Sequence, residues 1–254
     1  MSFKKLFSLF IIMLIVFSVL LAPVSFIAKY VDTPKNVAYQ SLSGTLWSGR
    51  ANVIQVDKWQ FNSLTWDMNI AALFTGKLSF DIKFGQARDA NQLSGKGTIG
   101  LGFNTLSLSE LTFRAPASAI RSELPIPTSE LNGRVILDID EFHMTSVTDP
   151  NEQMQMCDVL QGELLWTKAE VVFGQAMELG TIASKLSCNE GDVVATFDGS
   201  NKLGLEGNAR IESPDSFGFQ GFVKPDPSLP RDIHNGIKMF SQLDGQGRYP
   251  IKLS

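Results

Sequence analysis

"LNGRVILDID", residues 131–140, joins a Leu-x-Gly triplet to a run in which apolar residues recur at every second position. Side chains of a β-strand point alternately to opposite faces, so this period of two predicts a strand with one buried and one solvated face. The solvated face accounts for the two aspartates without a catalytic role. The two faces of this run are Val135, Leu137 and Ile139 against Asp138 and Asp140.

The same alternation recurs along most of the chain after residue 29. It predicts roughly ten short strands separated by turn residues, a pattern typical of all-β proteins. We therefore expect an all-β domain, built as an extended, coiled antiparallel sheet or an open barrel with one or two short helices. A change of parity at Asn104-Thr105 predicts a turn or bulge there. Clear alternating runs are 64–70, 78–84, 99–103, 135–139, 169–173 and 193–197.

The Leu-x-Gly triplet occurs six times, and its middle residue is always polar. We expect the leucine to pack under the sheet, the polar residue to face water, and the glycine to permit a bulge, a bend or a close backbone approach. The spacing of the triplets is too irregular for a strict solenoid. Two interpretations stay open: the glycines only mark where individual strands begin, or the triplets belong to a degenerate repeat. The triplets begin at Leu42, Leu93, Leu131, Leu160, Leu205 and Leu243.

The start of the chain is strongly apolar. Residues 6–22 read LFSLFIIMLIVFSVLLA, 17 residues without a charge, and apolar residues continue to position 27. Since about 20 apolar residues cross a bilayer as a helix, residues 6–27 are predicted to form a single N-terminal transmembrane helix. A cleaved signal peptide is the alternative, but Pro23 follows the best small residue, Ala22, and no A-x-A triplet ends the run.

The charges around this segment predict its orientation. Lys4 and Lys5 precede it, and only Lys29 follows closely. Because basic residues stay on the cytoplasmic side, residues 1–5 are predicted to be cytoplasmic and residues 29–254 to form a domain outside the membrane. The net charge is −4 and no basic stripe is present, which argues against nucleic acid as a partner.

The only cysteines are Cys157 and Cys188. An oxidising compartment outside the membrane would let them pair, so a disulfide is predicted. Two buried free thiols are the alternative, and the spacing does not suit a metal site.

Helical spacing is rare after the apolar start. One segment repeats apolar residues at intervals of four, four and three, which predicts a short amphipathic helix and a candidate partner-binding surface. The polar stretch 149–156 is predicted to be a loop and a boundary between halves 29–148 and 157–254. The residues of the candidate partner-binding helix are Leu229, Ile233, Ile237 and Phe240.

No set of residues assembles into a catalytic site. His143 and His234 lack triad or metal-ligand spacing, which predicts surface or hydrogen-bonded histidines. Residues 95–100 match G-x-G-x-x-G but continue into a strand pattern instead of a helix. The sequence therefore predicts no enzyme and no catalytic, cofactor or metal site. The 18 phenylalanines predict core packing, or alternatively a groove for an acyl chain or for an apolar edge of another protein.

Four stretches together resemble a known family. They are SLSGTLWSGRANVI (41–54), LTWDMNIAALFTGKLSFDI (64–82), LSGKGTIGLG (93–102) and CDVLQGELLWTKAEV (157–171). Their succession behind one apolar helix resembles protein N of the bacterial type II secretion system. The motifs are structural, so no catalytic residues carry over. Met68-Asn69-Ile70 stands where relatives often have a proline, which concerns only the local turn.

The resemblance implies a single-pass inner-membrane protein with a cytoplasmic N-terminus and a periplasmic domain. It further implies a non-catalytic accessory or assembly component of the machinery that exports folded proteins across the outer membrane. Its partners would be other inner-membrane components of that machinery. The alternative, suggested by the phenylalanine-rich coiled sheet, is a membrane-anchored periplasmic module that binds or transfers lipid in an apolar β groove.

Overall fold

The strands follow one another in space as they do in the sequence. The computed structural model describes residues 3–30, 34–121, 130–145, 155–173, 175–213 and 216–253. Within these ranges thirteen strands form one antiparallel sheet, open because β1 and β13 are its two edges. The strands are β1 (Val37–Gly44), β2 (Ser48–Val56), β3 (Trp59–Met68), β4 (Leu78–Phe84), β5 (Ser94–Gly102), β6 (Thr105–Pro116), β7 (Glu130–Thr145), β8 (Val159–Phe173), β9 (Gln175–Asn189), β10 (Asp192–Asp198), β11 (Glu206–Ser213), β12 (Ser216–Val223) and β13 (Tyr249–Leu253).

The all-β prediction is confirmed, with more short helices than the one or two expected. Apart from a longer first helix, four short helices occur in the described ranges. Three of them lie where the polypeptide passes from one strand to the next, after β3, after β6 and after β12. The helices are α1 (Phe3–Leu20), α2 (Val24–Ile27), α3 (Ile70–Leu73), α4 (Ala117–Ile120) and α5 (Arg231–Phe240).

The strand register separates apolar from polar side chains. Residues directly opposite each other in antiparallel strands point to the same face of a sheet. One row of paired residues from β4 to β8 is wholly apolar: Phe80, Ile99, Leu108, Phe142 and Leu160. The neighbouring row on the other face is wholly polar: Asp81, Thr98, Ser109, Glu141 and Gln161. The sheet therefore has one apolar and one polar face, as the alternation predicts.

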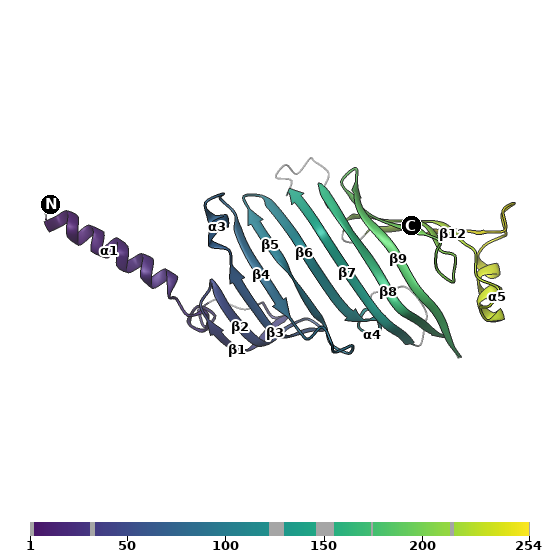
Figure 1. The fold of residues 1–254 in the computed structure, drawn as a ribbon, viewed down its shortest axis with the longest axis horizontal. Helices are drawn as coiled ribbons and strands as arrows, with labels where there is room; N and C mark the ends of the chain where they lie inside the picture. The colour runs from purple at the N-terminus through teal and green to yellow at the C-terminus, as the bar shows by residue number, and fades with distance from the viewer. Residues whose placement is uncertain are drawn as a thin grey trace.

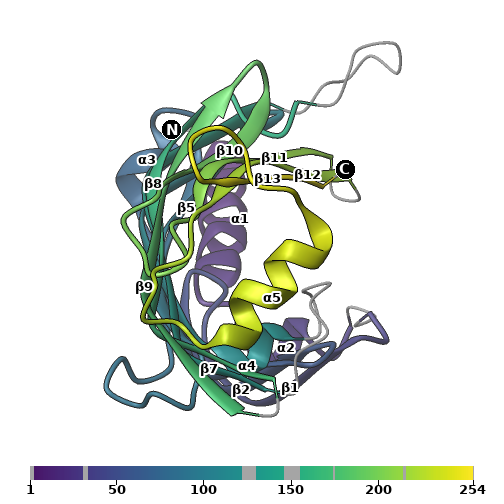
Figure 2. The same cartoon turned by 90° about the vertical axis from the view of Figure 1, so that its right-hand side faces the viewer.

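The sheet is long and curved. Figure 1 shows an extended, twisted ribbon with α1 projecting from the β1 end and α5 lying at the opposite end. Viewed along its length in Figure 2, the sheet curves around an inner side on which α4 and α5 lie. Ile233 of α5 packs against the same buried cluster as Val135 and Trp166, which are paired residues of the apolar face. The apolar face is therefore the inner, concave one.

Bulges contribute to this curvature. The pairing of β7 with β8 shifts between Asn132 and Arg134 and again between Ile139 and Glu141. Each shift inserts an extra residue, which bends the strand and increases its twist. Gly133, at the first shift, has a φ of +100°. As the glycine of a Leu-x-Gly triplet, it has the predicted role at a bulge.

A side chain at Gly133 is expected to destabilise the sheet. A Cβ there would clash with the carbonyl oxygens of Thr167 and Lys168 on β8, in a backbone conformation that suits glycine. We expect Gly133→Ala to lower the free energy of unfolding by about 1–3 kcal/mol, measured by urea denaturation. Gly245→Ala is the matched control, because a Cβ at Gly245 meets no atom within 4 Å. Equal stability of the two variants would contradict the role given to Gly133.

Two hydrophobic clusters line the inner side. The larger contains buried residues of β7, β8 and β9, among them Leu131, which is 1% exposed. The smaller is built on Phe84, Leu93 and Ala115, with the ring of Phe61 edge-on to Phe84 at 5.1 Å between centroids. Both clusters thus include a leucine from a Leu-x-Gly triplet, as expected.

The triplets do not all behave alike. Leu160 is buried, but Leu243 is 57% exposed and lies outside the sheet. Ser94, the middle residue of the triplet in β5, is only 2% exposed instead of facing water. The expectation that every middle residue is solvated is therefore wrong at this position.

The apolar N-terminal segment forms two helices. α1 ends at Leu20, and α2 begins after Pro23. Among the helices of the described residues, none combines the length and the hydropathy that a membrane span requires. The predicted single span over residues 6–27 is therefore not seen as one continuous helix.

The predicted boundary at 149–156 falls mostly outside the described residues. β7 and β8, which flank it, are paired from Glu130↔Val172 to His143↔Val159. A single sheet thus connects the two predicted halves, and their division into separate units stays a prediction.

Candidate functional site

The predicted amphipathic helix is present, but part of its apolar side is used within the protein. Leu229, just before α5, is 6% exposed and belongs to the larger cluster, and Ile233 packs against the same cluster. Ile237 is half-buried. The side chain of Phe240 lies outside the described residues. Binding of a partner by these residues stays a prediction, and the outward side of α5 is the part available for it.

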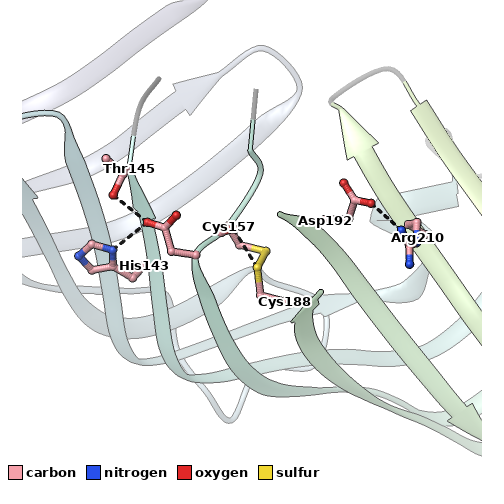
Figure 3. Close-up of a disulfide and its surroundings, with 7 residues drawn as sticks. His143, Thr145, Cys157, Cys188, Asp192 and Arg210 are labelled. Carbon is pink, nitrogen blue, oxygen red and sulfur yellow. Dashed lines mark hydrogen bonds and ion pairs between the residues drawn. A yellow bond between two sulfur atoms is a disulfide. The ribbon is translucent and has the colours of Figure 1, made fainter. Parts of the chain in front are cut away.

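The predicted disulfide is present. Cys157 and Cys188 are bonded, with 5.9 Å between their Cα atoms (Figure 3). The backbone N–H groups of Met156 and Cys157 also donate to the carbonyl of Gly191, at 2.7 and 3.2 Å. These links attach the segment that enters β8 to the turn between β9 and β10.

A hydrogen-bonded cluster lies beside the disulfide (Figure 3). The hydroxyl of Thr145 donates to Asp158 Oδ2 at 2.7 Å, and His143 Nδ1 lies 3.2 Å from the same oxygen. The Thr145 hydroxyl, together with His143, holds the pKa of Asp158 below its ordinary value. Nucleophilic catalysis needs the base between the hydroxyl and the acid, whereas here both side chains contact the carboxylate. The cluster therefore ties the end of β7 to the residue before β8.

Charged side chains in the C-terminal part of the sheet link neighbouring strands and stabilise a turn. Asp192 accepts from Arg210 Nη1 at 2.9 Å, which joins β10 to β11. The guanidinium of Arg248 donates through Nε to Asp244 at 3.1 Å and stacks on the ring of Phe222, 3.9 Å from its centroid. The stacking of Arg248 on Phe222 connects the turn before β13 with β12.

Acid is expected to weaken this C-terminal turn. The backbone N–H of Arg248, with that of Gln246 and the Arg248 side chain, holds the pKa of Asp244 below its ordinary value. A carboxylate with a lowered folded-state pKa stabilises the fold above its unfolded pKa, near 3.9, and this contribution is lost as pH falls through the folded-state value. Asp244→Asn should therefore have a lower urea midpoint than the parent at about pH 7, with the difference shrinking as the pH falls below the unfolded pKa. A difference that does not depend on pH would contradict this account.

The described residues offer little for catalysis or metal binding. Within them, no group of three or more His, Cys, Asp or Glu side chains is placed to hold a metal ion. The G-x-G-x-x-G segment lies inside β5 and opens no helix. A shallow depression on the polar face over β11–β13 is lined by residues such as Glu206, Gln220 and Lys252. The most extensive surfaces of the molecule are instead the apolar face of the sheet and its two edge strands.

The apolar face is only partly covered. Leu78 and Leu101, paired across β4 and β5, are 41% and 45% exposed. At the other end Ile211 and Phe217, paired across β11 and β12, are 37% and 50% exposed. Sequence alternation identified this face, but which of its residues stay open depends on where α4 and α5 lie.

The fold and its contacts define a class of protein: an open, disulfide-bonded, single-sheet β protein. The sequence model of the family "Type II secretion system (T2SS), protein N" matches residues 35–252. The chain belongs to this family, and membership implies a component of the type II secretion machinery.

Individual relatives agree with the family match. "Type II secretion system protein N" of Vibrio cholerae serotype O1 (strain ATCC 39315 / El Tor Inaba N16961) is 27% identical over 223 residues, covering 86% of this chain and 84% of the relative. The protein of the same designation from Aeromonas hydrophila is 28% identical over 253 residues, covering 96% and 95% of the two chains. No solved structure matches this chain.

Proposed function

We propose that this protein is a non-catalytic accessory component of type II secretion, held in the inner membrane by its N-terminal segment with its sheet in the periplasm. The family match over residues 35–252 is the observation that carries the proposal. The relatives described above are designated as components of the same system, which supports a role in protein transport. The protein would act by contacting other inner-membrane components while folded proteins cross the outer membrane.

The N-terminal segment supports the membrane attachment. α1 projects away from the sheet (Figure 1) and exposes apolar side chains such as Phe10 at 62% and Leu14 at 54%. A helix that is apolar all round is suited to apolar surroundings such as lipid. Apolar sequence continues past α1 to residue 27, so residues 6–27 together have the length of an anchor. The disulfide fits a sheet in the oxidising periplasm.

Two surfaces at the far end of the sheet suit contacts with other subunits. β13 is an edge strand. Pro250 has no N–H and its carbonyl already accepts from the Ser241 hydroxyl at 2.6 Å, so the part of the edge beyond Pro250 is the part that can pair with a strand of another protein. α5 exposes Met239 at 84%, although Leu229 and Ile233 are part of the protein's own core. The outward side of α5 together with the β13 edge is therefore our candidate for the partner-binding surface.

Deletion of the gene tests the proposed role. Folded enzymes that normally leave the cell should accumulate in the periplasm of the deletion strain, and a plasmid-borne copy should restore their export. A copy that lacks residues 1–28 and is sent to the periplasm by a cleavable signal peptide should not restore export, because the sheet would no longer be held at the membrane. Normal export in the deletion strain would refute the proposal.

A second candidate function is lipid binding on the concave face. The observation that favours it is the uninterrupted apolar row from β4 to β8, together with the open ends of that face. An acyl chain needs apolar walls and no hydrogen-bonding partners, which this face provides. Native mass spectrometry of residues 29–254, purified without detergent, separates the two candidates. Bound phospholipid supports lipid binding, whereas a lipid-free protein that captures secretion subunits supports the first proposal.

A further inference from the structure

A group of exposed apolar side chains lies where β4 begins and β5 ends. Phe74, in the turn after α3, is 91% exposed, and Phe103, in the turn after β5, is 93% exposed. The pairing of Leu78 with Leu101 brings these two turns to the same end of neighbouring strands. We name this group the α3 patch; its members are Ile70, Leu73, Phe74, Leu78, Leu101 and Phe103, all more than 40% exposed.

The backbone around α3 is well ordered by hydrogen bonds that do not involve these side chains. Asn69 Oδ1 accepts from the N–H of Ala71 at 3.0 Å and caps the helix. The N–H of Asn69 donates to the carbonyl of Ser79 at 2.8 Å, and that of Lys77 to Ala72 at 3.2 Å. The segment is thus closed on itself while its apolar side chains face outward. Core packing does not explain them, and a cluster of this kind marks a contact surface.

The charge of the α3 patch favours a membrane over a protein as its partner. Residues 69–79 and 100–109 contain a single ionisable side chain, Lys77, and no carboxylate. A lone lysine beside exposed aromatic and aliphatic side chains matches a bilayer surface, where anionic headgroups attract the ammonium group and the apolar side chains enter the acyl boundary. Protein interfaces usually surround their apolar centre with a polar, hydrogen-bonding rim.

The position of the α3 patch also agrees with a membrane as its partner. Figure 1 shows α3 at the same end of the molecule as α1. β1 begins only 17 residues after α1 ends, so this end of the sheet stays close to the membrane that would hold α1. We propose that the α3 patch is a second membrane contact, which inserts Phe74 and Phe103 into the leaflet facing the sheet. This contact rests on the N-terminal anchor proposed above. Two contacts define the orientation of the sheet relative to the bilayer more closely than α1 alone.

Brominated lipids test this contact in the full chain. Bromine quenches tryptophan fluorescence only at short range, so a tryptophan inserted in the bilayer loses signal. The chain is reconstituted into phosphatidylethanolamine–phosphatidylglycerol vesicles, and the quenching of Phe103→Trp is measured against the parent, which has four tryptophans. Phe217→Trp is the matched control, since Phe217 is 50% exposed on β12 at the far end of the sheet. We expect most of the added fluorescence of Phe103→Trp to be quenched and that of Phe217→Trp to be retained.

Flotation of the vesicles separates failure of the patch from failure of the anchor. If the chain floats with the vesicles but neither added tryptophan is quenched, the α3 patch is not a membrane contact and the anchor stands. If the chain does not float, both proposals are overturned. A Phe74→Ser/Phe103→Ser variant should float and unfold like the parent, yet lose protection of residues 69–79 from hydrogen exchange on vesicles. Unchanged protection in this variant would also overturn the contact.

Discussion

Replacing both cysteines by serine is expected to lower the free energy of unfolding by about 3–4 kcal/mol. The disulfide closes a loop across a sequence separation of 31 residues, and in the chain-entropy model a loop of this length strongly restricts the unfolded state. It also holds the entry to β8 against the turn after β9, where two backbone N–H groups donate to Gly191. The change is measured by urea denaturation of Cys157→Ser/Cys188→Ser and the parent in the same detergent.

Reduction of the parent provides the control for this result. A thiol reductant should lower the stability of the parent to that of the double variant and leave the variant unchanged. A loss of less than about 1 kcal/mol in the double variant would mean that the sheet fixes this segment without the bond.

Leu131→Ala is expected to lower the free energy of unfolding by about 2–5 kcal/mol. Leu131 is 1% exposed in the larger cluster, so truncation removes apolar contacts and leaves a cavity that the surrounding strands cannot close fully. Because Gly133, two residues further along β7, packs closely against the bulge in β8, the backbone has little freedom to move into the space. The loss is measured by the same urea denaturation.

Leu243→Ala is the matched control, since Leu243 begins another Leu-x-Gly triplet but is 57% exposed. We expect it to change stability by no more than about 0.5 kcal/mol. Similar losses for the two variants would show that the triplet, and not burial, decides the effect.

The sheet could be predicted from the sequence because each strand has one apolar face. Strand lengths could not, since bulges shift the parity within a strand. Leu108 and Leu111 both belong to the apolar face of β6, although they are three residues apart, because Glu110 between them has a φ of +50°. Alternation alone therefore divides β6 into two runs and underestimates the length of the strand. The parity change at Asn104 did correspond to the turn between β5 and β6.

The candidate surfaces were less predictable than the sheet. The spacing of Leu229 and Ile233 indicated an amphipathic helix, but spacing alone does not say whether the apolar side meets the protein's own core or a partner. Phe74 belongs to no alternating run, whereas Phe103 ends the run 99–103. The exposure of both follows from the single-layer sheet, which leaves both turns uncovered. The disulfide was predictable because the chain has only two cysteines.

Photo-crosslinking in intact cells tests the central claim most directly, namely that this sheet works by contact within the secretion machinery. A photoreactive residue is placed at Met239 on α5 or at Lys252 on β13, with exposed Lys96 on the polar face of β5 as the control. The account predicts adducts of the first two positions with another inner-membrane component of type II secretion, and none from the control. Adducts from none of these positions, in cells that export their enzymes normally, would contradict it.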